Sequence, residues 1–229
     1  MGITGMIYMV PMVFSLIVLI SCSSTMGYNY FQFTQQYQPA VCNSNPTPCK
    51  DPPDKLFTVH GLWPSNDVGD DPIYCKNKTI KSQQIGNLTA QLIIIWPNVL
   101  DRTDHVGFWN RQWNKHGSCG KAPTIKDEMH YFKTVIKMYI TQKQNVSEIL
   151  SRAKIEPEGK IRRRDDIINA IRLGTKDKKP KLKCQKNNQT TELVEITICS
   201  DRNLTQFIDC PRSSFKGSPF HCPTNHILY

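Results

Sequence analysis

Charged side chains are missing from the first 27 residues of the chain, which precede Tyr28. Most of this stretch is apolar, from Met6 to Ile20, and small or polar residues follow it. The apolar run of about 15 residues is shorter than the roughly 20 that a membrane-spanning helix needs. This pattern is typical of a secretory signal peptide, so we predict that residues 1–27 are removed and that the mature chain begins at Tyr28. Because no Lys or Arg precedes the apolar run, an uncleaved signal anchor is the alternative.

The sequence also lacks the Cys-x2-Cys spacing that is typical of zinc sites. Cys22 lies in the predicted signal peptide, and eight cysteines remain in the mature chain. An even number of cysteines in a secreted chain predicts four disulfide bonds. The eight are Cys42, Cys49, Cys75, Cys119, Cys184, Cys199, Cys210 and Cys222. His221 and His226 have a spacing that zinc accepts, but no acid or free thiol lies near them, so we predict neither a metal nor a cofactor.

Internal repeats, low-complexity tracts and long linkers are absent, which predicts a single domain over residues 28–229. This domain carries the whole net charge of +10 and favours an anionic partner, such as nucleic acid or an acidic polysaccharide. Five Asn-x-Ser/Thr sequons are candidate glycosylation sites. They are Asn77, Asn87, Asn145, Asn188 and Asn203.

The sequence predicts strands near both ends of the domain and helices between them. Aromatic and polar residues alternate over residues 28–37, and a short apolar run over 56–60 ends at Gly61. Further strands are expected over residues 182–186, 192–200 and 206–210, and helices over 85–96, 105–116, 125–142, 146–154 and 163–173. This order favours an α+β fold over an alternation of strands and helices.

Three segments are predicted to lie outside these elements. Residues 42–53 contain four prolines and are expected to form an irregular loop, and the polar residues 66–78 are expected to be exposed. The basic run from Lys176 to Lys183 is a candidate phosphate-binding patch. Since such runs are more often solvated loops, we favour a loop there.

The predicted helix over residues 105–116 carries two different faces. Trp109 and Trp113 lie four residues apart and form a ridge that we expect to face the core. A polar arc beside this ridge contains Arg111, Gln112, Lys115 and His116, and Phe108 lies close to it. Gly117 is expected to end the helix in the left-handed conformation.

Such an arc suits the cleavage of a phosphodiester. The reaction needs a base for the attacking hydroxyl, an acid for the leaving oxygen, and cations for the charge on phosphorus. Histidine serves both proton roles because its pKa is ordinarily about 6.5. His116 supplies one imidazole, and His60, at the end of a buried strand, is the best candidate for the second. His105 and His130 are expected to be structural. On composition alone, any single histidine of the chain, including His60, could have a structural role.

Two longer segments decide between these interpretations. Residues 57–66, FTVHGLWPSN, and residues 108–119, FWNRQWNKHGSC, resemble the two active-site boxes of the secreted T2-type ribonucleases. The opening YNYFQFTQQYQPAVC, the eight cysteines, the basic charge and the sequons resemble the S-RNases, the stylar self-incompatibility ribonucleases of flowering plants, in particular those of the rose family. The resemblance covers essentially all of the mature chain.

The resemblance implies a role for each site residue. His60 is expected to be the general acid for the leaving 5′-oxygen, His116 the base for the 2′-hydroxyl, and Lys115 the cation that stabilises the phosphorane. The substrate-binding residues are expected to be Trp63, Phe108 and Gln36. The implied fold is α+β, with a central antiparallel sheet and flanking helices. The implied disulfides are Cys42–Cys49, Cys75–Cys119, Cys184–Cys222 and Cys199–Cys210.

The chain departs from the wider family at three positions. Many members have His-Glu where this chain has Arg111 and Gln112, and an acidic residue where it has Ser65. Neither a guanidinium nor an amide transfers a proton at neutral pH, although both can bind a phosphate. We therefore expect a two-histidine mechanism in which Arg111 and Gln112 only stabilise the transition state, and the base preference of the family cannot be carried over.

The resemblance further implies how the protein is used. It predicts a metal-independent, monomeric endoribonuclease that is secreted into the style, cleaves RNA, and is recognised by pollen F-box proteins. An S-like ribonuclease for phosphate recovery or defence has the same chemistry without a role in mating. A protein of another class, an inactive secreted glycoprotein that binds RNA or carbohydrate, is the remaining alternative.

Overall fold

A computed structural model of the chain describes residues 1–2, 27–44, 48–187, 189–211 and 222–229. The predicted signal peptide lies almost wholly outside these residues, as do the sequon at Asn188 and the side chain of His221. Within the described ranges, no helix is long and apolar enough to cross a membrane.

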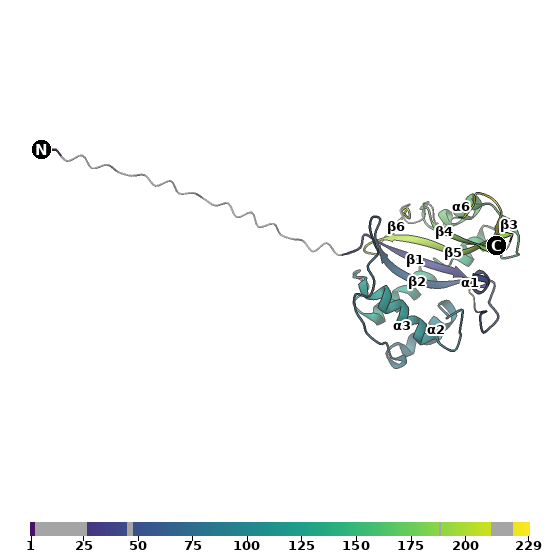
Figure 1. Cartoon of the computed structure of the whole chain (residues 1–229), viewed down its shortest axis with the longest axis horizontal. Helices are drawn as coiled ribbons and strands as arrows, with labels where there is room; N and C mark the ends of the chain where they lie inside the picture. Colours follow the sequence, from purple (N-terminus) through teal and green to yellow (C-terminus); the bar gives the residue numbers. More distant parts are fainter. Residues whose placement is uncertain (3–26, 45–47, 188, 212–221) are drawn as a thin grey trace.

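The strands of one mixed sheet form the centre of the fold (Figure 1). They are β1 (Tyr30–Tyr37), β2 (Phe57–Ser65), β3 (Ile161–Arg162), β4 (Lys181–Asn187), β5 (Thr190–Asp201), β6 (Phe207–Ile208) and β7 (Ile227–Leu228). β1 pairs with β2 on one side and with β5 on the other, and β4 and β6 both pair with β5. These pairs are antiparallel, as predicted, whereas the short pair of β5 and β7 is parallel.

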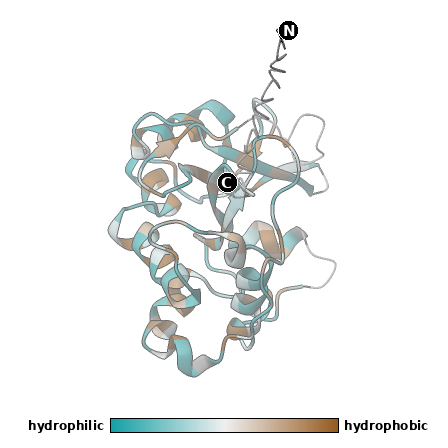
Figure 2. Cartoon of the chain, turned by 90° about the vertical axis from the view of Figure 1, so that its left-hand side faces the viewer, coloured by the Kyte–Doolittle hydropathy of each residue, from teal (hydrophilic) through white to brown (hydrophobic). Residues whose placement is uncertain are grey.

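Helices flank this sheet, as Figure 1 shows for α2 and α3 beside β2 and for α6 on the other side of the molecule. The α-helices are α1 (Gln38–Ser44), α2 (Gly86–Ile95), α3 (His105–Lys115), α4 (Glu128–Ile136), α5 (Val146–Arg152) and α6 (Arg164–Gly174). Three short helical turns accompany them, at Ser82–Ile85, Gly117–Cys119 and Lys137–Thr141. In the perpendicular view of Figure 2, hydrophobic and hydrophilic residues share the same helical ribbons, as expected for amphipathic helices.

The alternation along β1 separates a core face of the sheet from a polar face. Phe31 and Phe33 are fully buried against the helices, in a cluster that also contains Trp109 and Trp113 of α3. The tryptophan ridge of α3 therefore faces the core, as predicted. A second cluster packs α5 and α6 against β5. Gln32, Thr34 and Gln36 of β1 lie on the other face of the sheet, which carries the candidate site. Gln35 lies on the core face, where its side chain binds the backbone of Gln144 and Val146.

Two predictions about the elements around the sheet need correction. Residues 42–44, which were predicted to open an irregular loop, are instead the last residues of the short helix α1, which begins at Gln38. β2 does not end at Gly61 but continues to Ser65, even through Pro64. A proline is tolerated there because β2 is the last strand on its side of the described sheet, so its partner β1 lies on one side only.

All four predicted disulfides are present. They are Cys42–Cys49, Cys75–Cys119, Cys184–Cys222 and Cys199–Cys210. Two of them hold neighbouring segments together over short sequence distances, while Cys75–Cys119 spans 44 residues and Cys184–Cys222 spans 38. The fold is thus an α+β domain that is cross-linked by four disulfide bonds.

Helix side chains also hold the backbone of β2. The hydroxyl of Tyr131 donates to the carbonyl of Leu62, and the hydroxyl of Tyr139 donates to the carbonyl of Phe57, at 3.0 and 2.9 Å. Burial raises the pKa of both tyrosines, so they remain protonated donors. The indole of Trp96 donates to the carbonyl of His60 at 3.0 Å.

Candidate active site

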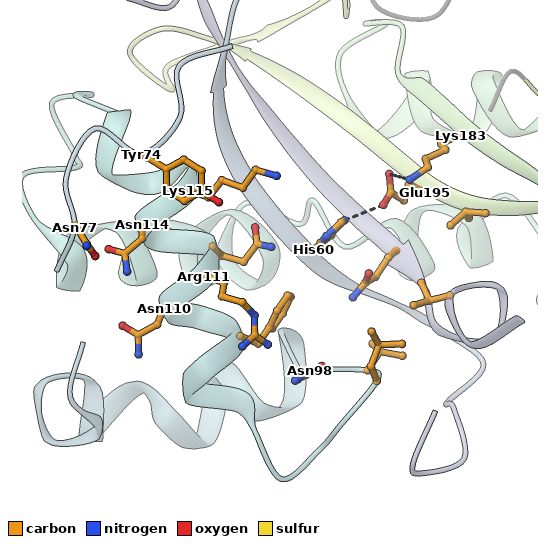
Figure 3. Close-up of a pocket in the computed structure, with 17 residues that line it drawn as sticks. His60, Tyr74, Asn77, Asn98, Asn110, Arg111, Asn114, Lys115, Lys183 and Glu195 are labelled. Carbon is orange, nitrogen blue, oxygen red and sulfur yellow. Dashed lines mark hydrogen bonds and ion pairs between the residues drawn. The ribbon is translucent and has the colours of Figure 1, made fainter. Parts of the chain in front are cut away.

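A cavity of about 840 Å³ lies between the polar face of the sheet and α3. Figure 3 shows its walls: His60, Glu195 and Lys183 on the strands, and Arg111, Asn114 and Lys115 on α3. Of the predicted site residues, His60, Lys115, Arg111, Gln112, Phe108 and Gln36 all line this cavity. Trp63 and His116 are not among the lining residues, but Trp63 contacts His60, and His116 contacts Trp63.

A β-bulge positions His60. Along β2, Gly61 pairs with Thr34 but Val59 pairs with Gln35, so His60 is the extra residue between them. A bulge of this kind redirects one side chain, and such bulges are frequent near active sites. The side chain of His60 remains partly exposed between buried neighbours, and it faces the cavity.

The imidazole of His60 is held by a carboxylate that the sequence analysis missed. Its Nδ1 lies 2.8 Å from Oε1 of Glu195, in the middle of β5. Burial by itself raises the pKa of the Glu195 carboxyl. The charges and hydrogen bonds of His60 and Lys183 have the larger, opposite effect, so the pKa lies below its ordinary value. Because an ionised carboxylate only accepts hydrogen bonds, Nδ1 of His60 carries a proton.

Lys183 completes this group from the edge strand. It lies opposite Glu195 in the pairing of β4 with β5, and its Nζ is 3.4 Å from Oε2. The basic run was predicted as a solvated loop, but its last residues belong to β4. A single charged residue between the apolar Val194 and Ile196 is the signal that could have found Glu195, since a buried charge needs a partner.

His116 follows the last residue of α3 and has a different environment. Its pKa is lowered from 6.5 to about 4, chiefly by burial and further by the charges of Lys115 and His60. Nδ1 is buried and has no hydrogen-bond partner among the residues that the structure describes. The fold therefore favours the neutral form of this ring.

The helix end itself differs from the prediction. Gly117 does not adopt the left-handed conformation but starts a tight turn that ends at Cys119. A glycine is needed there for space, since a Cβ would lie 2.7 Å from the ring of Trp113 and 2.8 Å from that of Tyr131. The close approach sets the position of His116 next to the core.

Trp63 connects the two imidazoles. Its ring centroid is 5.0 Å from that of His60 and 5.0 Å from that of His116. The indole Nε1 donates to Oε1 of Gln112 at 3.0 Å. Gln112 therefore orients Trp63, a contact that the helical arc alone did not predict.

The remaining predicted residues form the wall and the entrance of the cavity. Phe108 stacks nearly parallel to His60, with 6.5 Å between the ring centroids, and Gln36 is buried on β1. Lys115 is exposed and extends from α3 toward the sheet in Figure 3. Arg111 is exposed too and pairs with Asp104, whose carboxylate caps the start of α3.

The polar segment before α2 is exposed, as predicted, but it is attached to α3. Cys75 is bonded to Cys119, and the backbone N–H of Tyr74 donates to the carbonyl of Lys115 at 3.0 Å. The side chains of Asn110 and Asn114 accept hydrogen bonds from the backbone of the same segment. Tyr74 and the sequon residue Asn77 thereby reach the rim of the cavity (Figure 3).

The other candidates lie elsewhere. His105 accepts a hydrogen bond from the backbone of Asn98, and His130 pairs with the helix cap Asp127, so both are structural as predicted. Among the described residues, no group of three or more His, Cys, Asp and Glu could hold a metal ion. Asn77, Asn87 and Asn203 are exposed, whereas the side chain of Asn145 caps α5.

Comparison with known proteins identifies relatives over the full chain. The chain is 70% identical to ribonuclease S-4 of Pyrus pyrifolia over 226 residues, which cover 98% of this chain and 99% of the relative. The crystal structure of Japanese pear S3-RNase, at 66% identity, matches with a TM-score of 0.83 over 88% of this chain and 100% of that one. Ribonuclease MC1 from bitter gourd seeds, at 29% identity, matches with a TM-score of 0.73 over 87% of this chain and 100% of that chain.

The sequence profile of the Ribonuclease T2 family matches residues 28–210, which include both active-site boxes and Glu195. This range holds every residue that lines the cavity. The chain belongs to the ribonuclease T2 family.

Proposed function

We propose that this ribonuclease is an S-RNase, a secreted endoribonuclease that acts as the stylar determinant of self-incompatibility. The full-length similarity to pear S-RNases supports this role. One observation supports the chemistry: Nδ1 of His60 lies 2.8 Å from a carboxylate, whereas His116 is buried beside Lys115 and its pKa is lowered, so the two histidines have different electrostatic environments. That difference is what an acid–base pair needs at one pH.

In the proposed reaction His116 is the base and His60 is the acid. The neutral ring of His116 takes the proton of the 2′-hydroxyl as the 2′-oxygen bonds to phosphorus. The bond from phosphorus to the 5′-oxygen breaks, and His60 gives its proton to that oxygen. The products are a 2′,3′-cyclic phosphate and a free 5′-hydroxyl, and slower hydrolysis then gives a 3′-phosphate.

Positive charge stabilises the phosphorane. Lys115 is the proposed partner of the non-bridging oxygens, because it is exposed at the cavity and adjacent to His116. Arg111 is a secondary contact, since Asp104 already binds it. No metal is needed in this scheme, because imidazoles carry out the proton transfers and lysine supplies the charge.

The bases of RNA are proposed to contact the aromatic residues of the cavity. Phe108 and Trp63 offer ring faces, and Gln36 offers an amide on the floor formed by β1. A crystal structure of a ribonuclease MC1 variant, 29% identical to this chain, contains 5′-GMP, which supports nucleotide binding by this fold. DNA lacks the attacking 2′-hydroxyl and should not be cleaved.

The biological setting follows the relatives. We propose removal of residues 1–27, secretion into the stylar matrix, a monomeric enzyme, and recognition by pollen F-box proteins. Four disulfides support an oxidising compartment. Amino-terminal sequencing of the mature protein tests the cleavage site, and mass spectrometry of its glycopeptides tests the sequons at Asn77, Asn87, Asn145, Asn188 and Asn203.

The decisive experiment is RNA cleavage by the purified mature protein in excess chelator, with analysis of the fragment ends. Fragments that end in 2′,3′-cyclic phosphate support the proposal. No cleavage by folded, fully disulfide-bonded protein would contradict it and would indicate a secreted RNA-binding glycoprotein. The profile of kcat/KM against pH should be bell-shaped, with its acid limb near pH 4, where His116 becomes protonated.

A further inference from the structure

We propose that Glu195, which Lys183 keeps ionised, is a positioning residue that holds a proton on Nδ1 of His60 and so directs Nε2 to the leaving oxygen. The inference rests on the proposed role of His60 as the acid. It assigns a function to a pair of side chains on β4 and β5 that belongs to neither active-site box.

The geometry of the contact is the first argument. Oε1 of Glu195 lies 2.8 Å from Nδ1 of His60, across 135 residues of sequence. This bond fixes the orientation of the ring and its tautomer, because the carboxylate accepts at Nδ1 and leaves Nε2 as the nitrogen available to the substrate. The bulge in β2 and the contact of Trp96 with the carbonyl of His60 hold the backbone behind it.

The burial of the carboxylate is the second argument. Glu195 is 8% exposed, so water screens its charge only weakly. A buried carboxylate without a partner would cost several kcal/mol, and its two partners here are His60 and Lys183. The negative charge favours the imidazolium form of His60, which is the form that an acid needs.

The charges around His60 come from three elements. Glu195 on β5 is negative, whereas Lys183 on β4 and the α3 residues Lys115 and Arg111 are positive. His116, at the end of α3, adds positive charge only when it is protonated. Gln36 of β1 carries no charge. Glu195 is therefore the one negative side chain that lines the described cavity, and the acid form of His60 depends on it.

The test compares two carboxylates of the same strand. Glu195→Gln keeps the shape and an acceptor but removes the charge. Glu192→Gln is the control, because Glu192 is as deeply buried in β5 and binds the amides of Asn43, Gln185 and Asn187 instead of a histidine. Both variants are assayed for RNA cleavage between pH 4 and 9, under conditions where circular dichroism shows them folded.

We expect the alkaline limb of the kcat/KM profile to move down by about 1–3 pH units in Glu195→Gln, the usual effect of one close opposite charge, and to stay in place in Glu192→Gln. Activity at pH 7 then falls at least tenfold, whereas activity at pH 5 changes much less. Lys183→Met removes the positive neighbour and should move the same limb upward. A limb that does not move upward in Lys183→Met would contradict the charge balance assigned to His60, Glu195 and Lys183.

A second readout separates this inference from the proposed function. The ring resonances of His60 are followed by NMR through a pH titration of the wild type and of Glu195→Gln. A lower titration midpoint in the variant supports the inference, and an unchanged midpoint overturns it, whatever the activity. The role of His60 is tested on its own by His60→Gln, which should lose nearly all turnover; substantial remaining turnover contradicts the proposed function.

Discussion

At the scale of the residue, the environment of His116 links activity to stability. The fold favours the neutral ring, since burial and the positive charges of Lys115 and His60 lower its pKa to about 4. In the unfolded chain the pKa returns to about 6.5. Between these values the unfolded chain binds more protons than the folded one, so His116 lowers stability progressively as the pH falls from 6.5 to 4.

The variant His116→Asn should therefore lose less stability than the wild type on acidification. Thermal unfolding is measured at pH 7 and at pH 4.5, and the difference in Tm between the two pH values is compared. His226→Asn is the control, because this histidine is exposed and lies outside the cavity; its pH dependence should follow that of the wild type. Equal pH dependence in all three proteins would contradict the assigned environment of His116.

Gly61 offers a second test at this scale. A Cβ there would collide with Nε1 of Trp63 and would lie 2.7 Å from Oε1 of Gln112. Gly61→Ala should displace the indole, which is the far end of a side chain and can move. We expect activity to fall at least tenfold with a loss of about 1–3 kcal/mol in stability, measured by cleavage assays and urea unfolding. Full activity in a folded variant would exclude a role for this position of Trp63.

At the scale of the element, α3 combines a core ridge with the polar arc of the site. Gln112 lies one turn before His116, and its carbonyl accepts the backbone N–H of His116 at 3.0 Å. A negative charge one turn away should favour the imidazolium form of His116. Gln112→Glu should therefore raise the pKa of His116 and move the acid limb of kcat/KM to higher pH.

The pH–rate profile of Gln112→Glu is compared with that of Gln91→Glu, which makes the same charge change at an exposed position of α2. We expect the limb to move by about one pH unit or more in the first variant and to stay in place in the second. If both limbs stay near pH 4, the carboxylate does not act on His116.

The elements also show how far the sequence can predict this fold. The 3.6-residue periodicity of α3 and the alternation of β1 were sufficient, because each reflects local burial. β2 was predicted too short, since Gly61 and Pro64 normally end a strand, and only the pairing with β1 carries it past them. The two-residue strands β3 and β7 leave no periodic signal and were missed.

The sequence predicted the main residues of the candidate site but not the contacts between them. His60, His116 and Lys115 came from the two boxes, and the structure places His60 and Lys115 in one cavity, with Trp63 between His60 and His116. Glu195 was missed because its contact with His60 joins residues that are 135 positions apart. The orientation of Trp63 by Gln112, across 49 positions, was missed for the same reason.

At the scale of the whole molecule, the four disulfides differ in the length of chain that they close. Cys75–Cys119 spans 44 residues and Cys42–Cys49 spans 7. On loop entropy alone, the longer bridge should contribute about 1.6 kcal/mol more to the free energy of unfolding. Double Cys→Ser variants of each pair are compared by urea unfolding. A larger loss for the 42–49 pair would show that native contacts, and not loop entropy, dominate.

The net charge of +10 gives a second prediction at this scale. Each phosphate contact with Lys or Arg releases counterions, so kcat/KM for polymeric RNA should fall steeply as salt rises from 50 to 200 mM, by about tenfold or more. A dinucleotide with a single phosphate serves as the control and should show a much weaker dependence. Parallel salt dependences would mean that the basic surface beyond the cavity does not contact the substrate.

The hydrogen bonds that Tyr131, Tyr139 and Trp96 donate to β2 have a consequence beyond catalysis. A strand at the border of a sheet normally offers unpaired carbonyls to any extended peptide, which invites aggregation and strand exchange. Here three carbonyls of β2 already bind side chains of the helical layer. The strand that carries His60 is thus a poor template for pairing with an extended segment of a second chain.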